Sequence, residues 1–223
     1  MNYFRCIGGN GGGGGGSSQF TYTKQKLFEP SGIGSSQWKD DTDTTALTVD
    51  GGTYTATAGE YIEINSSNQL RLSMPIAGSY YLFGIRCKVD PNFTPNNADQ
   101  WYNASCVLGT ELGGEQKDYA IVIDKNGYFA LGWATAYITS SDVSALDGQE
   151  HELFVMALGG NIVLFIDGVQ KVSVQKGMNG SEMYNMGVFW NKSGNGTRVN
   201  GEIYAVGYWQ YTEPSFDYNL PSI

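Results

Sequence analysis

The only histidine of the chain, His151, stands between Glu150 and Glu152 at the start of an apolar run. An imidazole can act as a general base, but a triad around it would need a serine and an aspartate from other segments. In a strand the two glutamates lie on one face. Beyond them the run is purely apolar, with no further acid for glycoside hydrolysis. We interpret His151 as a residue at a strand end, satisfied by backbone groups, and expect no catalytic residues.

A loop rich in carboxylates could hold a metal ion. The segment "KDDTD", Lys39 to Asp43, carries three aspartates. Ca²⁺ takes six to eight oxygen ligands, which loop aspartates and carbonyls can supply. The alternative is a solvated acidic loop. The sequence also lacks the Cys and His spacing of a zinc site. We expect no cofactor and leave calcium open.

Three aromatic clusters have the side chains that sugar recognition needs, an aromatic face with amide or carboxylate groups beside it. Each cluster could equally be core or packing between subunits. Trp133 is followed by Tyr137, on or just beyond the same strand. The candidate carbohydrate-binding residues are Trp101, Tyr102 and Asn103 in the first cluster, Trp133 in the second, and Trp190, Asn191 and Asn195 in the third.

The composition favours strands as the elements that position these residues. Aromatics make up 13% and glycines number 31, a profile of short strands and many turns. A net charge of −9 without a basic patch argues against nucleic acid as a partner. Cys6, Cys87 and Cys106 do not form a disulfide framework, and we expect Cys87 and Cys106 to be buried free thiols, with a pair between them left open.

Targeting signals are not evident in the sequence. The head "MNYFRCIGG" lacks a basic segment followed by an apolar run, so we expect no secretion signal. No stretch approaches 18 apolar residues, so we expect no membrane insertion.

Alternating apolar and polar residues recur from residue 18 onward and predict about a dozen strands. Asn126–Gly127 separates two apolar runs and predicts a hairpin, and Asp167–Gly168 predicts a second tight turn. The segment from Ser140 to Gly148 is the one candidate for a helical turn, capped by Ser140 or Ser141. The pattern predicts an all-β, two-sheet antiparallel jelly-roll sandwich.

The order of these segments resembles the concanavalin-A-like lectin/glucanase superfamily, in its laminin-G-like and pentraxin-like members. The resemblance runs from about Phe20 to Tyr211 and is carried by "GQEHELFVMALGGNIVLFIDGVQKVSVQ", by "YYLFGIRCKVD" and by "NMGVFWNKSGNGTRVNGEIYAVGYWQYTEP". It implies the fold, while lectins, glycosidases, adhesion modules and spacers all occur in the superfamily. The Glu-x-Asp-x-(x)-Glu pattern of its retaining glucanases is missing here.

The stretch "CIGGNGGGGGGSSQF", Cys6 to Phe20, cannot build a core. Extended polyglycine can pack against other chains through backbone hydrogen bonds, which suggests an oligomerisation stem or an anchor. The alternative is a loose tail. A short head, a glycine-rich stem and a lectin-like sandwich resemble the architecture of bacteriophage fibre or decoration proteins.

We therefore expect a head and stem over residues 1–17, a sandwich over 18–213 and a tail over 214–223. The expected function is a non-enzymatic carbohydrate-binding or adhesion module on a virion or extracellular surface. The expected partners are a host envelope or mucosal glycan and, through the N-terminal segment, either a homo-oligomer, preferably a trimer, or a larger particle. A structural spacer and a glycoside hydrolase are the alternatives. The expected core comprises Phe154, Val155, Ile162, Leu164, Ile166, Val188, Ile203 and Val206.

Overall fold

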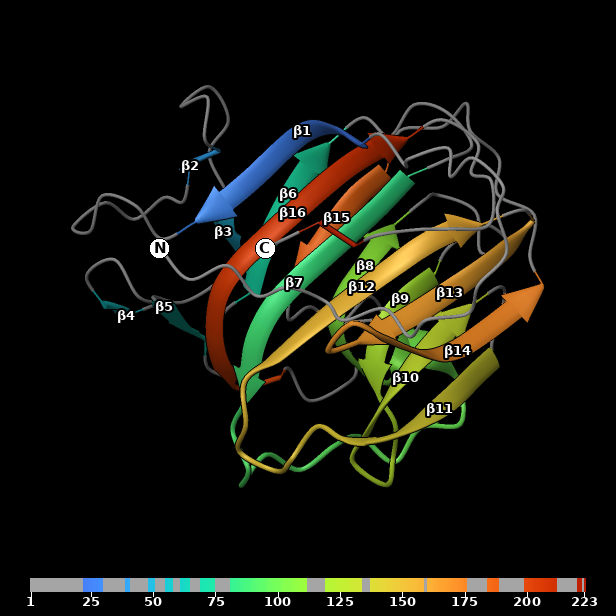
Figure 1. Cartoon of the computed structure of the whole chain (residues 1–223). Coiled ribbons are helices and arrows are strands. Elements are labelled where there is room, and N and C mark those ends of the chain that lie inside the picture. The colour runs from blue at the N-terminus through green and yellow to red at the C-terminus, as the bar shows by residue number, and fades with distance from the viewer. Residues whose placement is uncertain are drawn as a thin grey trace.

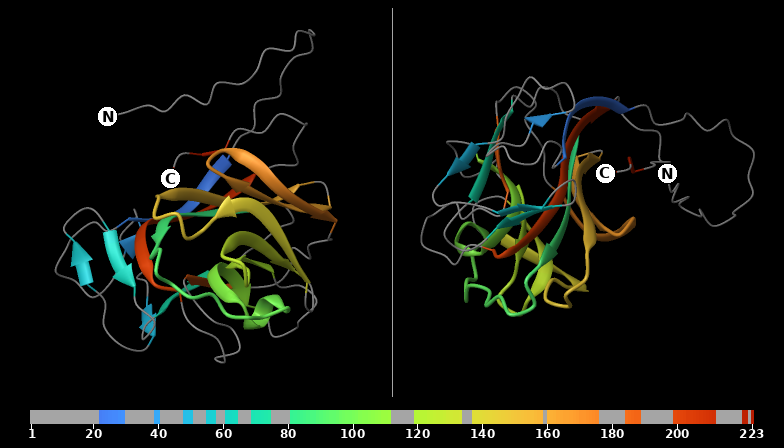
Figure 2. Two further views of the ribbon diagram at one scale, coloured as in Figure 1. Left: turned by 90° about the horizontal axis from the view of Figure 1, so that it is seen from below. Right: turned by 90° about the vertical axis from the view of Figure 1, so that its left-hand side faces the viewer.

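The computed structural model describes residues 22–29, 39–40, 48–50, 55–57, 61–64, 69–74, 81–111, 119–133, 137–158, 160–175, 184–188, 199–211, 220–221 and 223. Two antiparallel sheets lie face to face, as Figure 1 and Figure 2 show. In these ranges the only helix is the 3₁₀ turn η1, Trp101–Asn103, and no helix is long and apolar enough to cross a membrane. The predicted jelly-roll sandwich is confirmed.

Sheet A has nine strands, in the order β14-β13-β12-β7-β16-β1-β2, with β5 beside β16 and β4 beside β5. Their bounds are β1 Tyr22–Glu29, β2 Lys39–Asp40, β4 Thr55–Thr57, β5 Tyr61–Ile64, β7 Tyr81–Val89, β12 His151–Leu158, β13 Asn161–Ile166, β14 Val169–Gln175 and β16 Gly201–Tyr211. The long strands β7 and β16 run side by side through its middle (Figure 1).

Sheet B has seven strands, in the order β11-β10-β9-β8-β15-β6-β3. Their bounds are β3 Thr48–Asp50, β6 Gln69–Met74, β8 Ser105–Glu111, β9 Tyr119–Ile123, β10 Tyr128–Trp133, β11 Tyr137–Ser144 and β15 Tyr184–Val188. The β9–β10 hairpin turns at Asn126–Gly127, as the sequence predicts, and Gly127 has a φ of 86° that favours glycine.

Strands β12 and β13 bury both of their faces. Leu153 and Val155 face the space between the sheets, whereas Phe154 and Met156 pack on the outer face of sheet A. This alternation follows from the period of two in a strand. Because neither face is wet, the two strands read as continuous apolar runs.

Seven of the eight predicted core residues are buried, with at most 1% of their surface exposed; these are Phe154, Val155, Ile162, Leu164, Ile166, Ile203 and Val206. Burial of the eighth, Val188, lies outside the described side chains. The outer face of sheet A is also covered by Leu220 and Ile223 near the C-terminus, which lies over this sheet in Figure 1.

Cys87 and Cys106 are free and buried, as expected, while Cys6 lies outside the described residues. Cys87 lies on β7 and Cys106 on β8, in different sheets. Burial raises the pKa of the Cys87 thiol well above its usual range, with Glu150 and Asp167 adding to the shift.

The expected helical turn between Ser140 and Gly148 is wrong. Strand β11 continues to Ser144 and pairs with β10, and a non-helical turn follows. Ser141 and Ser144 do use their hydroxyls locally, because each accepts a hydrogen bond from a backbone N–H two residues later. Such hydroxyl-to-backbone bonds support turns as well as helix starts, so the serines alone do not distinguish a helical turn from a non-helical one.

Candidate functional site

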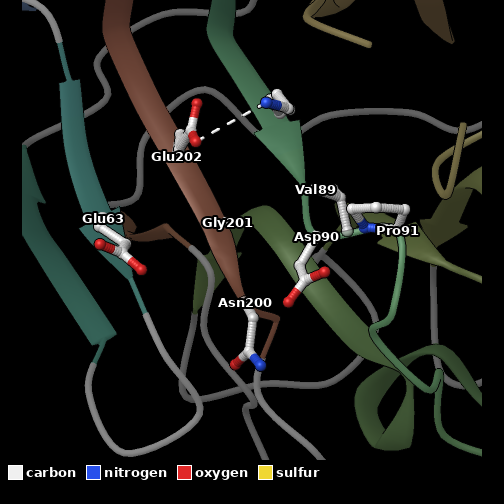
Figure 3. Close-up of a pocket in the computed structure, with 8 residues that line it drawn as sticks. Glu63, Val89, Asp90, Pro91, Asn200, Gly201 and Glu202 are labelled. Atoms are coloured by element: carbon white, nitrogen blue, oxygen red, sulfur yellow. Dashed lines mark ion pairs between the residues drawn. The ribbon is translucent and has the colours of Figure 1, made fainter. Parts of the chain in front are cut away.

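A cavity of about 250 Å³ opens where β5, β7 and β16 come together at one end of sheet A. Figure 3 shows Glu63 on β5 on one side, with Asp90 and Asn200 opposite it. The lining combines charged and amide side chains with apolar ones; it consists of Glu63, Lys88, Val89, Asp90, Pro91, Asn200, Gly201 and Glu202. Its size suits one small ligand group rather than a long chain.

The close approach of two strands sets one wall of the cavity. Gly201 begins β16 opposite Val89 of β7, and a Cβ atom at Gly201 would lie 2.2 Å from the carbonyl oxygen of Lys88. Only glycine permits this approach without a backbone shift. The same pair of strands is closed by the backbone N–H of Asp90, which donates to the carbonyl of Asn200 at 3.0 Å.

The turn after β7 fixes the carboxylate of Asp90. Its Oδ1 atom accepts hydrogen bonds from the backbone N–H of Asn92 at 2.8 Å and from the Asn92 side-chain amide at 3.2 Å. The N–H of Phe93 donates to the Asp90 carbonyl, and the Phe93 ring is buried in the core. This side-chain-to-backbone arrangement is a common local use of aspartate in turns.

The cavity is lined by both hydrogen-bond donors and hydrogen-bond acceptors. The Lys88 Nζ atom lies 3.7 Å from Glu202 Oε1, an ion pair marked in Figure 3. The Oε2 atom of Glu202 accepts the hydroxyl of Tyr204 at 2.5 Å, and burial together with this carboxylate raises the pKa of Tyr204. The Oδ1 atom of Asn200 is buried without a hydrogen-bond partner among the described residues. An unpaired buried acceptor is costly, and because this atom has almost no accessible surface, a ligand reaches it only after the Asn200 side chain moves.

A polar strip continues from the cavity across sheet A. The guanidinium of Arg86 lies 5.6 Å from the ring centre of Tyr204, and the ring centres of Tyr204 and Tyr61 lie 5.7 Å apart. Arg86 Nε is 3.1 Å from Glu150 Oε1, and Arg86 Nη1 donates to the carbonyl of Ile223 at 3.2 Å. Arg86 therefore holds Glu150 and the end of the chain against this sheet.

The structure corrects the partners expected for His151. Two carboxylates hold its buried ring: Nδ1 lies 2.7 Å from Asp167 Oδ2, and Nε2 lies 3.2 Å from both oxygens of Asp147. Asp167 also accepts the backbone N–H of Glu152 at 2.9 Å. The hydrogen bond to Asp167 raises the pKa of His151 against the opposing effect of burial. We call these three side chains the histidine clasp.

The first aromatic cluster lies against the outer face of sheet B. Trp101 is 2% exposed and packs with Ala104, Cys106 and Ala130, so its ring serves as core there rather than as a free platform. A Cβ atom at Gly132 would come within 2.4 Å of Trp101, so the glycine makes room for the ring. Tyr102 is half-buried and donates its hydroxyl to Gln100 Oε1. The N–H of Asn103 donates to the Gln100 carbonyl, and sugar binding by Tyr102 and Asn103 stays a prediction.

The second cluster keeps an exposed aromatic surface. Trp133 is half-buried at the end of β10, and the ring of Tyr137 stacks on it with centres 4.7 Å apart and planes at 27°. The third cluster, with Trp190, Asn191 and Asn195, lies outside the described residues. The structure therefore places Trp101 and Trp133 on opposite faces of sheet B and does not bring them into one site.

The acidic segment Lys39 to Asp43 is described only at Lys39 and Asp40, which form β2. Among the described side chains, no group of three or more His, Cys, Asp or Glu is placed to hold a metal ion. We assign no calcium site to these residues.

The sequence does not predict the cavity residues, because they come from three separate segments and none of them lies in a recognisable motif. A weak signal existed. "VDPN" follows one predicted strand and "VNG" precedes another, and both read as turns with carboxylate or amide side chains. Only the pairing of β7 with β16 brings the two turns together.

Comparison with known proteins finds no matching family model and no matching curated protein sequence. Solved structures do match in fold. Domain 4 of AbnA, a GH43 extracellular arabinanase from Geobacillus stearothermophilus solved with arabinotriose, has a TM-score of 0.59 and 16% identity, over 88% of this chain and 94% of that one.

Two further structures extend the likeness. The exoplasmic/lumenal domain of VIP36 in its Ca²⁺-bound form has a TM-score of 0.53 and 12% identity, over 86% of this chain and 92% of that one. The sialidase of Trypanosoma rangeli has a TM-score of 0.63 and 13% identity over 82% of this chain, which spans 30% of the sialidase. All three matches are jelly-roll, concanavalin-like β-sandwiches, a fold found in lectins and in domains of glycoside hydrolases.

Proposed function

We propose that this protein is a non-enzymatic carbohydrate-binding module, and that the cavity between β5, β7 and β16 takes a sugar unit. The observation that carries the proposal is the cavity lining itself. Glu63 and Asp90 present carboxylate oxygens, Lys88 presents an ammonium group, and Asn200 lines the cavity beside them with its side-chain amide.

A neutral, hydroxyl-rich ligand satisfies such a mixed set better than an anion does. Each sugar hydroxyl can donate one hydrogen bond and accept others, so it can face a carboxylate, an amide or an ammonium group. Three carboxylates and one lysine in the lining disfavour an anionic sugar. Glu202 and Lys88 neutralise one another in part, which leaves Glu63 and Asp90 as acceptors.

The fold comparisons support the ligand class. The arabinanase domain was solved with arabinotriose, and the VIP36 domain was solved with Ca²⁺ and a mannose disaccharide at a TM-score of 0.51. We propose the same class of ligand here, a glycan of a host envelope or mucosa. Calcium is proposed only as an accompanying ion, and no site is assigned to it among the described residues.

A glycan array probed with the full-length chain tests the proposal. We expect a restricted set of neutral glycans to be retained, and arabinotriose and mannobiose serve as soluble competitors. Glu63→Ala should weaken retention, whereas Asp142→Ala removes an exposed carboxylate that pairs with Lys171 and should not. Retention of no glycan would favour the alternative of a structural spacer.

The non-enzymatic part of the proposal rests on the acidic residues. Glu150 pairs with Arg86, and the carboxylates at His151 hold the histidine clasp. In that arrangement Glu150, Asp147 and Asp167 act as structural partners, and the hydrolase alternative rests on Glu63 and Asp90, which face one another across the cavity. Glycoside hydrolysis stays the second alternative.

We further propose display on a bacteriophage particle or another extracellular surface, as a trimer or a larger assembly. The support is the glycine-rich stretch from Cys6 to Phe20, which lies outside the described residues. Its backbone groups need partners that other chains can supply.

A further inference from the structure

Tyr137 is the most exposed large apolar side chain among the described residues, with 57% of its surface free. One face of its ring stacks on Trp133, which itself packs against the core between the sheets. An exposed aromatic ring with a fixed partner behind it is a preorganised surface, because its side-chain entropy is already reduced.

The neighbouring hydrogen bonds fix the orientation of the pair. Tyr137 lies directly opposite Trp133 in the β10–β11 register. The indole N–H of Trp133 donates to Thr139 Oγ1 at 3.2 Å, so Trp133 is held both by packing and by this bond. The polar requirement of the indole is therefore met inside the protein, and the free surface of the pair is the apolar face of Tyr137.

This surface is separate from the cavity. Lys125 in the β9–β10 turn pairs with Asp99 at 2.7 Å, which ties that turn to the loop after β7, where the cavity residue Asp90 lies. Strand β10 then runs away from this end and reaches Trp133 at the other. The cavity and the aromatic pair thus lie at opposite ends of the sandwich.

We infer that Tyr137 on Trp133 forms a second glycan contact, which stacks against the C–H face of an equatorially substituted, β-linked pyranose. Such a ring carries axial C–H groups on both faces, which match the negative face of an aromatic ring. The inference takes its ligand class from the proposed function but rests on a different surface.

The size and surroundings of the pair favour a sugar ring over a protein partner. A stable protein interface buries about 800 Å² on each side, with several apolar anchors. The other exposed large apolar residues of the described chain, Tyr128 and Val169, do not lie beside Tyr137 on β11. The nearest β11 residue on the same face as Tyr137 is instead the polar Thr139, whose hydroxyl accepts the indole N–H of Trp133.

Saturation-transfer NMR with cellohexaose, a soluble β-linked pyranose chain, tests this contact on the full-length protein. We expect saturation of the sugar C–H protons in the parent. Tyr137→Ala should weaken binding about five- to tenfold, as the loss of one aromatic stacking contact does, while Tyr137→Phe should retain it. Tyr128→Ala, at a 40% exposed tyrosine that begins β10, is the matched control. Thermal melts confirm that each variant folds.

Equal binding by the parent and Tyr137→Ala, or no saturation transfer in the parent, would overturn the inference. A parent dimer that Tyr137→Ala dissociates in sedimentation velocity would also overturn it, since the pair would then be a protein interface. The proposed function has its own readout: Glu63→Ala acts on the array glycan and should leave the cellohexaose signal unchanged. Failure of one contact is thereby distinguished from failure of the other.

Discussion

At the scale of single residues, the histidine clasp joins three parts of the chain. His151 begins β12, Asp147 lies in the preceding turn, and Asp167 lies in the β13–β14 turn with a φ of 51°. The ring also meets Phe129 of the opposite sheet edge-on, with centres 5.3 Å apart. A positive φ at a residue other than glycine is strained, and the two hydrogen-bonded roles of Asp167 offset that strain.

The clasp predicts how stability depends on pH. The folded-state pKa of His151 is raised above 6.5, so its contribution is complete below that pH and is lost as pH rises through the folded pKa. Asp167 has a lowered pKa, so its contribution is present above pH 3.8 and is lost as pH falls further. We expect urea denaturation to show stability falling as the pH rises above about 6.5 and through the raised pKa of His151. In His151→Gln this slope should vanish; the same slope in the variant would refute the assignment.

The acidic residues also predict the absence of hydrolysis. Glu150 is held by Arg86, and burial raises the pKa of Glu152. A glycosidase needs one free carboxylate and one protonated acid facing the same bond, and the ion pair with Arg86 engages Glu150. We expect no release of reducing ends from a β-glucan. Release that disappears in Glu150→Gln or Glu152→Gln would show instead that the protein is an enzyme.

At the scale of elements, the strands of the sandwich are largely readable from the sequence. Alternation and turn residues are local signals, so β9, β10, β12 and β13 could be placed from them. The conformation of "SSDVSALDG" could not be predicted from local signals, because its first residues, Ser140 to Ser144, are held in a strand by pairing with β10. The cavity depends on the register of β7 with β16, and local patterns do not encode register between distant segments.

Substitutions in the core strands test this strand assignment directly. Leu164 on β13 and Ile203 on β16 are wholly buried between the sheets. Truncation of either residue to alanine should cost about 2–5 kcal/mol, from lost burial and the cavity left behind. Ser173→Ala, at an exposed position of β14, is the control and should leave the free energy of unfolding nearly unchanged. Chemical denaturation measures all three, and parent-like stability of the core variants would mean that these strands are misplaced.

At the scale of the whole molecule, the sandwich presents two separated polar or aromatic surfaces. The cavity lies at one end and the Trp133–Tyr137 pair at the other. Weak contacts of this kind gain strength when several copies act together, because linked binding events raise the effective concentration. An assembly built through the glycine-rich stretch would suit an adhesion module.

Deletion of residues 1–17 tests the assembly. Ordering glycines costs about 1–2 kcal/mol per residue, so an extended stem is expected only where several chains share its backbone hydrogen bonds. We expect the deletion variant to keep the thermal transition of the parent and to lose its assembly mass in light scattering. An unchanged assembly mass would mean that the glycines are a loose tail.

The central claim is that the cavity binds a neutral sugar, and calorimetric titration of one array-selected glycan tests it most directly. The parent should bind with a measurable enthalpy. Asn200→Ala removes an amide from the cavity lining and Glu63→Ala removes the facing carboxylate, and each should weaken binding about tenfold or more, as the loss of hydrogen bonds to a ligand does. Asp142→Ala should bind like the parent. Parent-like affinity in both cavity variants would contradict the account, because the glycan would then bind elsewhere.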